Sequence, residues 1–269
     1  MLFKKYPTVL KYLLAILLFG LALVISTLLN QGIIKQYFPY VSCILLFVVT
    51  WYLFKTDKKS LNAIGLKFSL KNISFLPLGL LIGALALLGA TYVRTLYLGE
   101  TIKISTSIDY AAILYAFYFI LPQVATEEFL FRGYLFKETI ETSNVVIANI
   151  IFSILFMLIH VVDENVLKNK GMIIMLVFAI PVGHLLFATA LLKSQTLFFP
   201  IGLHLGNNWA TRHLISDLNS DDSILFIPDG ITFDTWPPFI ITLTLFNGFF
   251  LLVTFLIWKW DRVEALLKR

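Results

Sequence analysis

Long apolar runs separated by short polar segments recur along the whole chain. A helix needs about 20 mostly apolar residues to cross the hydrocarbon core of a bilayer. The pattern predicts an all-α fold, a multi-pass transmembrane helical bundle with about eight spanning helices, while counts of seven or nine remain open. The predicted helices cover residues 12–29, 37–54, 73–93, 110–126, 145–162, 172–192, 196–210 and 238–258.

Two of these runs carry a packing signal. The seventh, residues 196–210, is short and polar at its centre, so we expect an interior helix that other helices shield from lipid. In the third run, Gly79 and Gly83 have the small-x-x-x-small spacing that lets two membrane helices approach closely.

The composition is that of a membrane protein. Of the 269 residues, 59% are hydrophobic and only 14% are charged, and the mean hydropathy is +0.86. This is more apolar surface than one soluble core of this size could bury. Because no repeat or soluble insertion interrupts the runs, we expect residues 1–269 to form one membrane-embedded domain. Cys43 is the only cysteine, which excludes an intramolecular disulfide and a thiolate metal cluster.

The basic residues indicate the orientation of the chain. The net charge is +5, and the lysines and arginines lie mostly in the short segments between the runs. With a cytoplasmic N-terminus, 15 of the 21 basic residues fall on the inner side and 6 on the outer side, as the positive-inside rule requires. We therefore expect both termini in the cytoplasm, the bilayer as a partner, and no nucleic acid.

The segment 55–72 carries five lysines interleaved with apolar residues. Such a segment can lie on anionic lipid as an amphipathic stretch, or it can form a solvated basic loop. The sequence leaves both interpretations open.

Polar residues inside the runs form three clusters: Glu127 and Glu128 with Arg132, Phe156 with His160, and His204 with Asn208. Ionisable groups at membrane depth are costly, so each needs a partner, a cavity or a function.

In the first cluster, Glu128 and Arg132 are four residues apart on one helix face and predict an ion pair. Glu127 points about 100° away from Glu128. It shares its face mostly with apolar residues, an environment that suits a general base.

The three clusters are predicted to converge at one depth. If the helix that carries Glu127 continues to a turn at residues 142–144, Glu127 and His160 lie 16 and 17 residues from Ser143 on antiparallel helices. His204 and Asn208 share one face of the seventh helix, and together they could stabilise an oxyanion.

Each cluster also has a structural interpretation. Glu128 and Arg132 can be a structural ion pair, His160 an interior histidine, and His204 with Asn208 an interhelical contact. His184, in the sixth run, is interpreted as packing close to the same cavity. The three clusters are predicted to lie at one depth in the membrane, and independent structural roles give no reason for this coincidence. The shared depth therefore favours the functional interpretation.

These residues resemble the CAAX protease and bacteriocin-processing (CPBP) intramembrane peptidases, also called the ABI family. Its first motif, Glu-Glu-x-x-x-Arg extended by Gly, is similar to EEFLFRG at residues 127–133. Its second, Phe-x-x-x-His, matches Phe156 to His160, and its third, His-x-x-x-Asn, matches His204 to Asn208. We expect the peptidase-like core at about residues 110–212.

The resemblance implies an intramembrane endopeptidase that hydrolyses a membrane-associated protein or peptide in a bacterial cell membrane. It implies that Glu127 activates water with help from His160, that His204 and Asn208 stabilise the oxyanion, and that Glu128 and Arg132 support the site. We expect no metal cofactor, although two histidines and a carboxylate could ligate zinc in an alternative mechanism.

Two other function classes stay open. Some relatives act as partners, so the chain could be a non-catalytic scaffold or a bacteriocin-immunity factor. A proton-coupled transporter is disfavoured because the sequence has no inverted repeat or paired broken helices. The substrate and the oligomeric state do not follow from the sequence.

Overall fold

The structure is a computed structural model that describes residues 7–217, 219–228, 233 and 235–261. The fold is a helical membrane bundle, as predicted, and every predicted run contains a helix. Four helical spans within the described residues are long and apolar enough to cross a membrane: Thr8–Leu29, Leu70–Leu98, Lys170–Ser194 and Trp236–Trp258. The helices α4 (Val41–Thr56) and α9 (Val145–Val161) are apolar but shorter.

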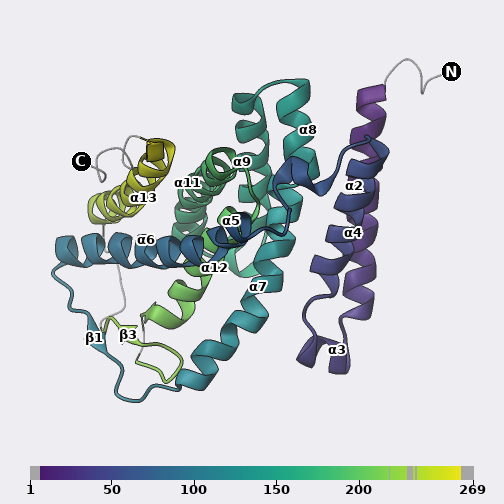
Figure 1. The fold of residues 1–269 in the computed structure, drawn as a ribbon. Coiled ribbons are helices and arrows are strands. Elements are labelled where there is room, and N and C mark those ends of the chain that lie inside the picture. Colours follow the sequence, from purple (N-terminus) through teal and green to yellow (C-terminus); the bar gives the residue numbers. More distant parts are fainter. Residues whose placement is uncertain (1–6, 218, 229–232, 234, 262–269) are drawn as a thin grey trace.

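The first two predicted helices form a hairpin at one edge of the molecule (Figure 1). The helices α2 (Pro7–Leu29) and α4 pack together, and the short α3 (Gly32–Tyr37) connects them. α4 also packs against α7 (Tyr110–Arg132). Near α3, the Tyr118 hydroxyl of α7 donates a hydrogen bond of 2.7 Å to the carbonyl of Tyr37. The hairpin is therefore attached to the helix that carries the first motif.

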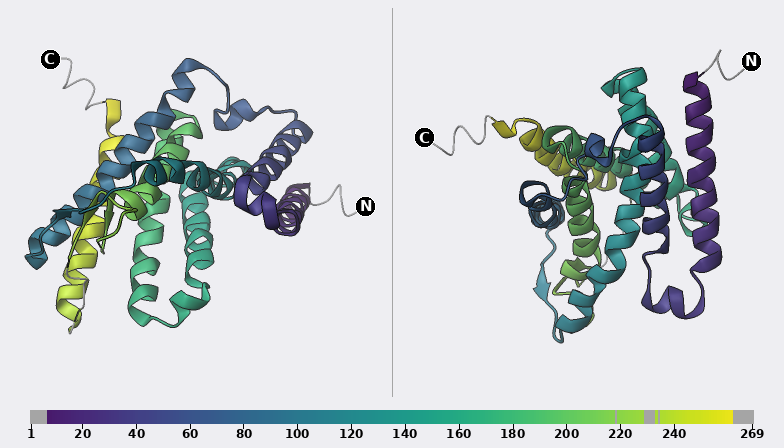
Figure 2. Two further views of the ribbon diagram at one scale, coloured as in Figure 1. Left: turned by 90° about the horizontal axis from the view of Figure 1, so that it is seen from below. Right: turned by 45° about the vertical axis from the view of Figure 1, so that its right-hand side comes forward.

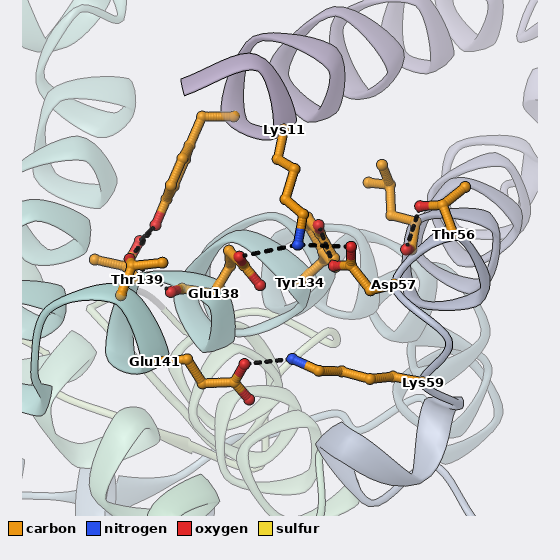
Figure 3. A network of polar contacts seen from close by, with 11 residues as sticks. Lys11, Thr56, Asp57, Lys59, Tyr134, Glu138, Thr139 and Glu141 are labelled. Carbon is orange, nitrogen blue, oxygen red and sulfur yellow. Dashed lines mark hydrogen bonds and ion pairs between the residues drawn. The ribbon is translucent and has the colours of Figure 1, made fainter. Parts of the chain in front are cut away.

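A polar cluster fixes the opposite end of this hairpin to α8 (Tyr134–Thr142), as Figure 3 shows. The Lys11 ammonium of α2 lies 2.7 Å from Asp57 Oδ1 and 3.6 Å from Glu138 Oε1. The Tyr134 hydroxyl donates a hydrogen bond of 2.7 Å to Asp57 Oδ2. Burial alone would raise the pKa of Asp57, but the hydrogen bonds from Lys11 and Tyr134 outweigh it and lower that pKa below 3.8.

The lysine-rich segment 55–72 folds back onto the protein. It contains the short helices η1 (Leu61–Ile64) and α5 (Leu70–Ile73). Ile64 accepts a hydrogen bond of 2.9 Å from the Leu197 amide, and the Thr196 hydroxyl donates one of 2.9 Å to the Gly65 carbonyl. The segment thus holds the turn that precedes α12 (Phe198–Trp209).

Glycines bring α6 (Phe75–Leu98) and α12 into backbone contact. A methyl group added at Gly83 would overlap the Leu203 carbonyl, and one added at Gly206 would overlap the Leu80 carbonyl. Gly79 and Gly202 face the partner helix in the same way. The predicted close contact at Gly79 and Gly83 is confirmed, and Gly202-x-x-x-Gly206 is its reciprocal partner on α12.

α12 is an interior helix, as predicted. Every residue from Phe199 to Gly206 is buried, and α12 packs against α6, α7 and α11 (Lys170–Ser194). The shielding allows a histidine and an asparagine to occupy a helix at membrane depth.

α7 extends beyond the predicted end at residue 126 and reaches Arg132. At Gly133 the chain leaves the helical path, and a Cβ there would overlap the Phe129 carbonyl. α8 then continues to Thr142, and Asn144 caps the start of α9 by accepting a hydrogen bond of 2.9 Å from the Ile147 amide. The expected continuation to a turn at residues 142–144 is therefore present, with one break at Gly133.

The remaining long helices form a second group. Figure 2 shows α9, α11 and α13 (Trp236–Trp258) running alongside one another, and α11 packs against both neighbours. In Figure 1, α6 runs sideways across the view, whereas α7 runs obliquely from bottom to top. At one end of the fold, three short strands pair in the order β1 (Lys103–Ile104), β3 (Leu225–Phe226) and β2 (Ile215–Ser216).

Candidate active site

The centre of the site is a buried carboxylate, Glu128, that faces the Arg132 guanidinium and the His204 imidazole. Glu128 Oε1 accepts a hydrogen bond of 3.0 Å from Arg132 Nη1 and lies 2.8 Å from His204 Nδ1. The side chains of Glu128 and Arg132 are both 0% exposed. The ion pair predicted from their spacing is present, and the contact with His204 joins α7 to α12.

The Arg132 guanidinium is also held by aromatic rings. It lies 4.3 Å from the ring centroid of Phe156 on α9 and 5.2 Å from that of Phe187 on α11. Phe187 in turn stacks on the His204 imidazole, with centroids 4.6 Å apart and an interplanar angle of 17°. Four helices therefore contribute to the position of Arg132 and His204.

Glu127 lies on the other side of the His204 ring. Its Oε2 is 3.6 Å from His204 Nε2, and its Oε1 accepts a hydrogen bond of 3.3 Å from Gln123 Nε2. The side chain is 15% exposed. Glu127 Oε2 is buried and accepts no hydrogen bond from another described residue, so His204 Nε2 is the polar group that faces this oxygen.

Gln123 extends the site along α7. Its Oε1 accepts a hydrogen bond of 3.4 Å from Arg212 Nη2. Arg212 lies in the short helix η2 (Ala210–Leu214), which follows α12. Sequence reasoning missed Arg212 as a neighbour of the site. The signal was the position of Gln123, one helical turn before Glu127.

Phe156 stands between His160 and the acidic cluster. Its ring centroid lies 4.7 Å from that of His160, 6.0 Å from that of His204 and 4.9 Å from that of Phe131. His160 Nδ1 lies 2.8 Å from the Phe156 carbonyl, so Nε2 is the nitrogen that remains for substrate or water.

Glu127 and His160, predicted to lie at one depth, form no direct hydrogen bond or ion pair with each other among the described side chains. Glu127 contacts His204 instead. The Phe131–Phe156 contact lies one turn from Glu127 on α7 and one turn from His160 on α9. The predicted antiparallel register therefore holds locally and brings both residues to the same region.

Asn208 is half-buried on α12, four residues after His204. Its amide makes no hydrogen bond to another described residue.

His184 is 1% exposed and lies against Phe136 and Phe156, with centroid distances of 5.9 Å and 6.4 Å. Neither of its ring nitrogens has a hydrogen-bond partner among the described residues. This agrees with the packing position expected for it beside the site.

The donor arrangement does not fit a zinc site. Within the described part of the chain, no three His, Cys, Asp or Glu side chains converge so that they could hold a metal ion. Glu128 Oε1 is already shared by Arg132 and His204, and a structural or catalytic zinc requires at least three protein ligands.

Residues 109–210 match a family model described as Rce1-like, type II CAAX prenyl endopeptidase Rce1-like. No curated protein and no solved structure matches the chain. The matched segment begins at Asp109, the N-cap of α7, and ends at Ala210, directly after α12. It contains all three motifs and every side chain proposed for catalysis, and it indicates a CAAX-type endopeptidase that acts on protein or peptide. Residues 109–210 of this chain form an Rce1-like domain of the CPBP family.

Proposed function

We propose that the chain is a glutamate-dependent intramembrane endopeptidase in which Glu127 is the general base. The observation that carries this proposal is the position of the Glu127 carboxylate, 3.6 Å from His204 and with one buried oxygen free of hydrogen bonds to described residues. Glu128 is the structural acid, since Arg132 and His204 both bind it. Two adjacent carboxylates thus have different environments and different tasks.

In the proposed reaction, Glu127 takes a proton from a water molecule while the water oxygen attacks the carbonyl carbon of the scissile peptide bond. His204 and Asn208 donate hydrogen bonds to the resulting oxyanion. The C–N bond then breaks, and Glu127 passes the proton to the leaving amine. One water is consumed, and one carboxyl and one amine terminus form.

Glu128 supports this role of His204 through orientation. By holding His204 Nδ1 at 2.8 Å, it directs Nε2 toward Glu127 and the substrate. His160 offers its Nε2 to the water, because its Nδ1 faces the Phe156 carbonyl.

The proposed substrate is a membrane-tethered protein or peptide that reaches the site from the cytoplasmic side. This orientation rests on the 15 inner and 6 outer basic residues. Of these, Lys4, Lys5, Arg262, Lys268 and Arg269 lie outside the described residues.

Comparative membrane proteomics tests the proposal in the cell. Cells that carry Glu127→Ala should accumulate one or more uncut membrane-associated proteins whose shorter products are present with the wild-type chain. Metal chelators should leave cleavage by the purified protein intact, because no step passes through a metal.

A non-catalytic scaffold or immunity factor is the competing function. It requires that a stably inserted Glu127→Gln, His160→Ala double variant keeps the biological function of the wild type. Loss of function in that variant, with unchanged membrane levels, excludes the scaffold.

A further inference from the structure

A polar cavity lies at the ends of the membrane helices, separate from the peptidase motifs. It has a volume of about 250 Å³ and is lined in part by Lys71, Lys193, Ser194 and Asp261. Lys71 lies in α5 just before α6, Lys193 is in the last turn of α11, and Asp261 follows α13. Three of the four candidate membrane spans therefore end at this cavity, which places it at the level of the lipid headgroups.

The charge of the cavity favours an anion. Its lining carries two lysines and one aspartate, a net charge of +1. Lys193 Nζ lies 2.8 Å from Asp261 Oδ2, which leaves further N–H donors on that ammonium. Lys71 is exposed and forms no ion pair with another described residue. The Ser194 hydroxyl already donates to the Ala190 carbonyl at 2.7 Å, so the lysines are the donors available to a ligand.

Three aromatic rings form the rest of the lining. Phe75 lies 5.2 Å from Phe199 and 6.2 Å from Trp260, and Phe199 lies 5.9 Å from Trp260, measured between centroids. Tryptophan is typical of the boundary between lipid and water. On α13, the adjoining Leu252, Phe255 and Leu256 are 50%, 50% and 46% exposed, so an apolar surface for acyl chains leads away from the cavity.

We propose that this cavity binds the phosphate group of an anionic phospholipid, with Lys71 and Lys193 as its ligands. Basic pockets between membrane helices bind anionic lipid headgroups in this way. A phosphodiester with a single negative charge matches the net charge of the lining. The neighbouring apolar surface distinguishes a phospholipid from a soluble phosphate.

The bound lipid would brace the helix pair that carries the candidate active site. Phe75 is the first residue of α6 and lies one turn before Gly79, and Phe199 lies in the first turn of α12, five residues before His204. A ligand bound against both residues stabilises the close α6–α12 contact. This binding does not rest on peptidase activity, so it stands or falls separately from the proposed function.

The test compares lipid binding by the purified full chain in phosphatidylcholine nanodiscs with and without phosphatidylglycerol, by thermal unfolding and native mass spectrometry. We expect phosphatidylglycerol to bind and to raise the unfolding temperature. Lys71→Gln and Lys193→Gln should each weaken binding about fivefold, because one lysine near anionic lipid contributes about 1 kcal/mol. Asp261→Asn should strengthen binding, since it removes the competing negative charge.

Lys58→Gln is the matched control, because Lys58 is exposed on the same segment and lies outside the cavity. An equal loss in Lys58→Gln, or weaker binding by Asp261→Asn, overturns the proposal and leaves only general surface charge. Inorganic phosphate added to phosphatidylcholine nanodiscs should have no effect. Stabilisation by inorganic phosphate alone would overturn the assignment to a phospholipid.

Discussion

His204 contacts both carboxylates of the first motif, one through each ring nitrogen. The sequence predicted that His204, Glu127 and Glu128 lie in one region, because their helices place them at one depth. It did not predict that His204 separates the two acids, because the direction of its side chain depends on the angle at which α12 crosses α6 and α7. That angle is set by glycines whose partners are distant in the sequence.

Asn208 tests the proposed stabilisation of the oxyanion at the residue scale. Asn208→Ala should lower kcat by about 10²–10³-fold, as the loss of one oxyanion donor does, while KM changes little. Asn207→Ala is the control, since Asn207 is the adjacent half-buried amide on α12 and has no proposed role. Steady-state cleavage of a membrane-tethered peptide separates kcat from KM.

The buried pair of Glu128 and Arg132 should matter to stability as well as to activity. Arg132→Met leaves the buried Glu128 carboxylate without its guanidinium partner. The free energy of unfolding should fall by about 3–5 kcal/mol. The double variant Glu128→Gln, Arg132→Met should lose much less than the sum of the two single changes, because no unpaired charge remains. Thermal unfolding in detergent measures the difference, and additive losses would contradict the assigned pairing.

At the scale of elements, the α6–α12 contact is the most specific feature of the fold. Gly206→Ala should destabilise the protein and lower activity together, because the added methyl group meets the Leu80 backbone and displaces α12. Gly248→Ala on α13 is the control, since nothing lies within 4 Å of its added methyl group. Alanine there should be neutral or stabilising by up to about 1 kcal/mol.

An equal effect of Gly206→Ala and Gly248→Ala on the unfolding temperature would show that α6 and α12 are not in backbone contact at Gly206.

Gly79-x-x-x-Gly83 was recognisable from its spacing within an apolar run. Gly202-x-x-x-Gly206 has the same spacing, but its pairing with α6 joins segments that are distant in the sequence.

The attachment of the α2–α4 hairpin to α8 depends on Asp57. The pKa of Asp57 is lowered in the folded protein, so the ionised carboxylate stabilises the fold at any pH above its ordinary pKa of 3.8. This stabilisation is lost as the pH falls through the lowered pKa. Asp57→Asn should therefore lower the unfolding temperature at neutral pH, with a difference from the wild type that shrinks below pH 3.8. Unfolding followed across this pH range checks the expectation, and a difference independent of pH would argue against the ion pair with Lys11.

The helices themselves were largely predictable, because apolar runs are a strong signal in lipid. The end of α7 was not, since Glu127 and Glu128 looked like the polar border of a membrane helix. Instead, Glu128 is buried and Glu127 is half-buried, and one oxygen of each is held inside the protein. Arg132 and His204 contact Glu128 Oε1, and Gln123 donates to Glu127 Oε1. The two-residue strands could not be predicted, since each is too short to show an alternating pattern and β1 pairs with the distant β3, Lys103 opposite Phe226.

At the scale of the whole molecule, the candidate site lies where two groups of helices meet. α7 belongs with the α2–α4 hairpin, whereas α9 and α11 run together with α13 (Figures 1 and 2). Glu127 and Glu128 come from the first group, Phe156 and Phe187 from the second, and His204 from α12 between them. A movement between the groups would therefore change the distance between the proposed base and its neighbours.

The central claim is that Glu127 removes the proton from the attacking water. The most direct measurement is the cleavage rate of a membrane-tethered peptide by purified protein in liposomes, for the wild type, Glu127→Gln and the exposed control Glu164→Gln. Glu127→Gln should lower kcat by about 10²–10⁴-fold with an unchanged unfolding temperature, while Glu164→Gln should match the wild type. Cleavage by correctly folded Glu127→Gln at the wild-type rate would contradict the claim.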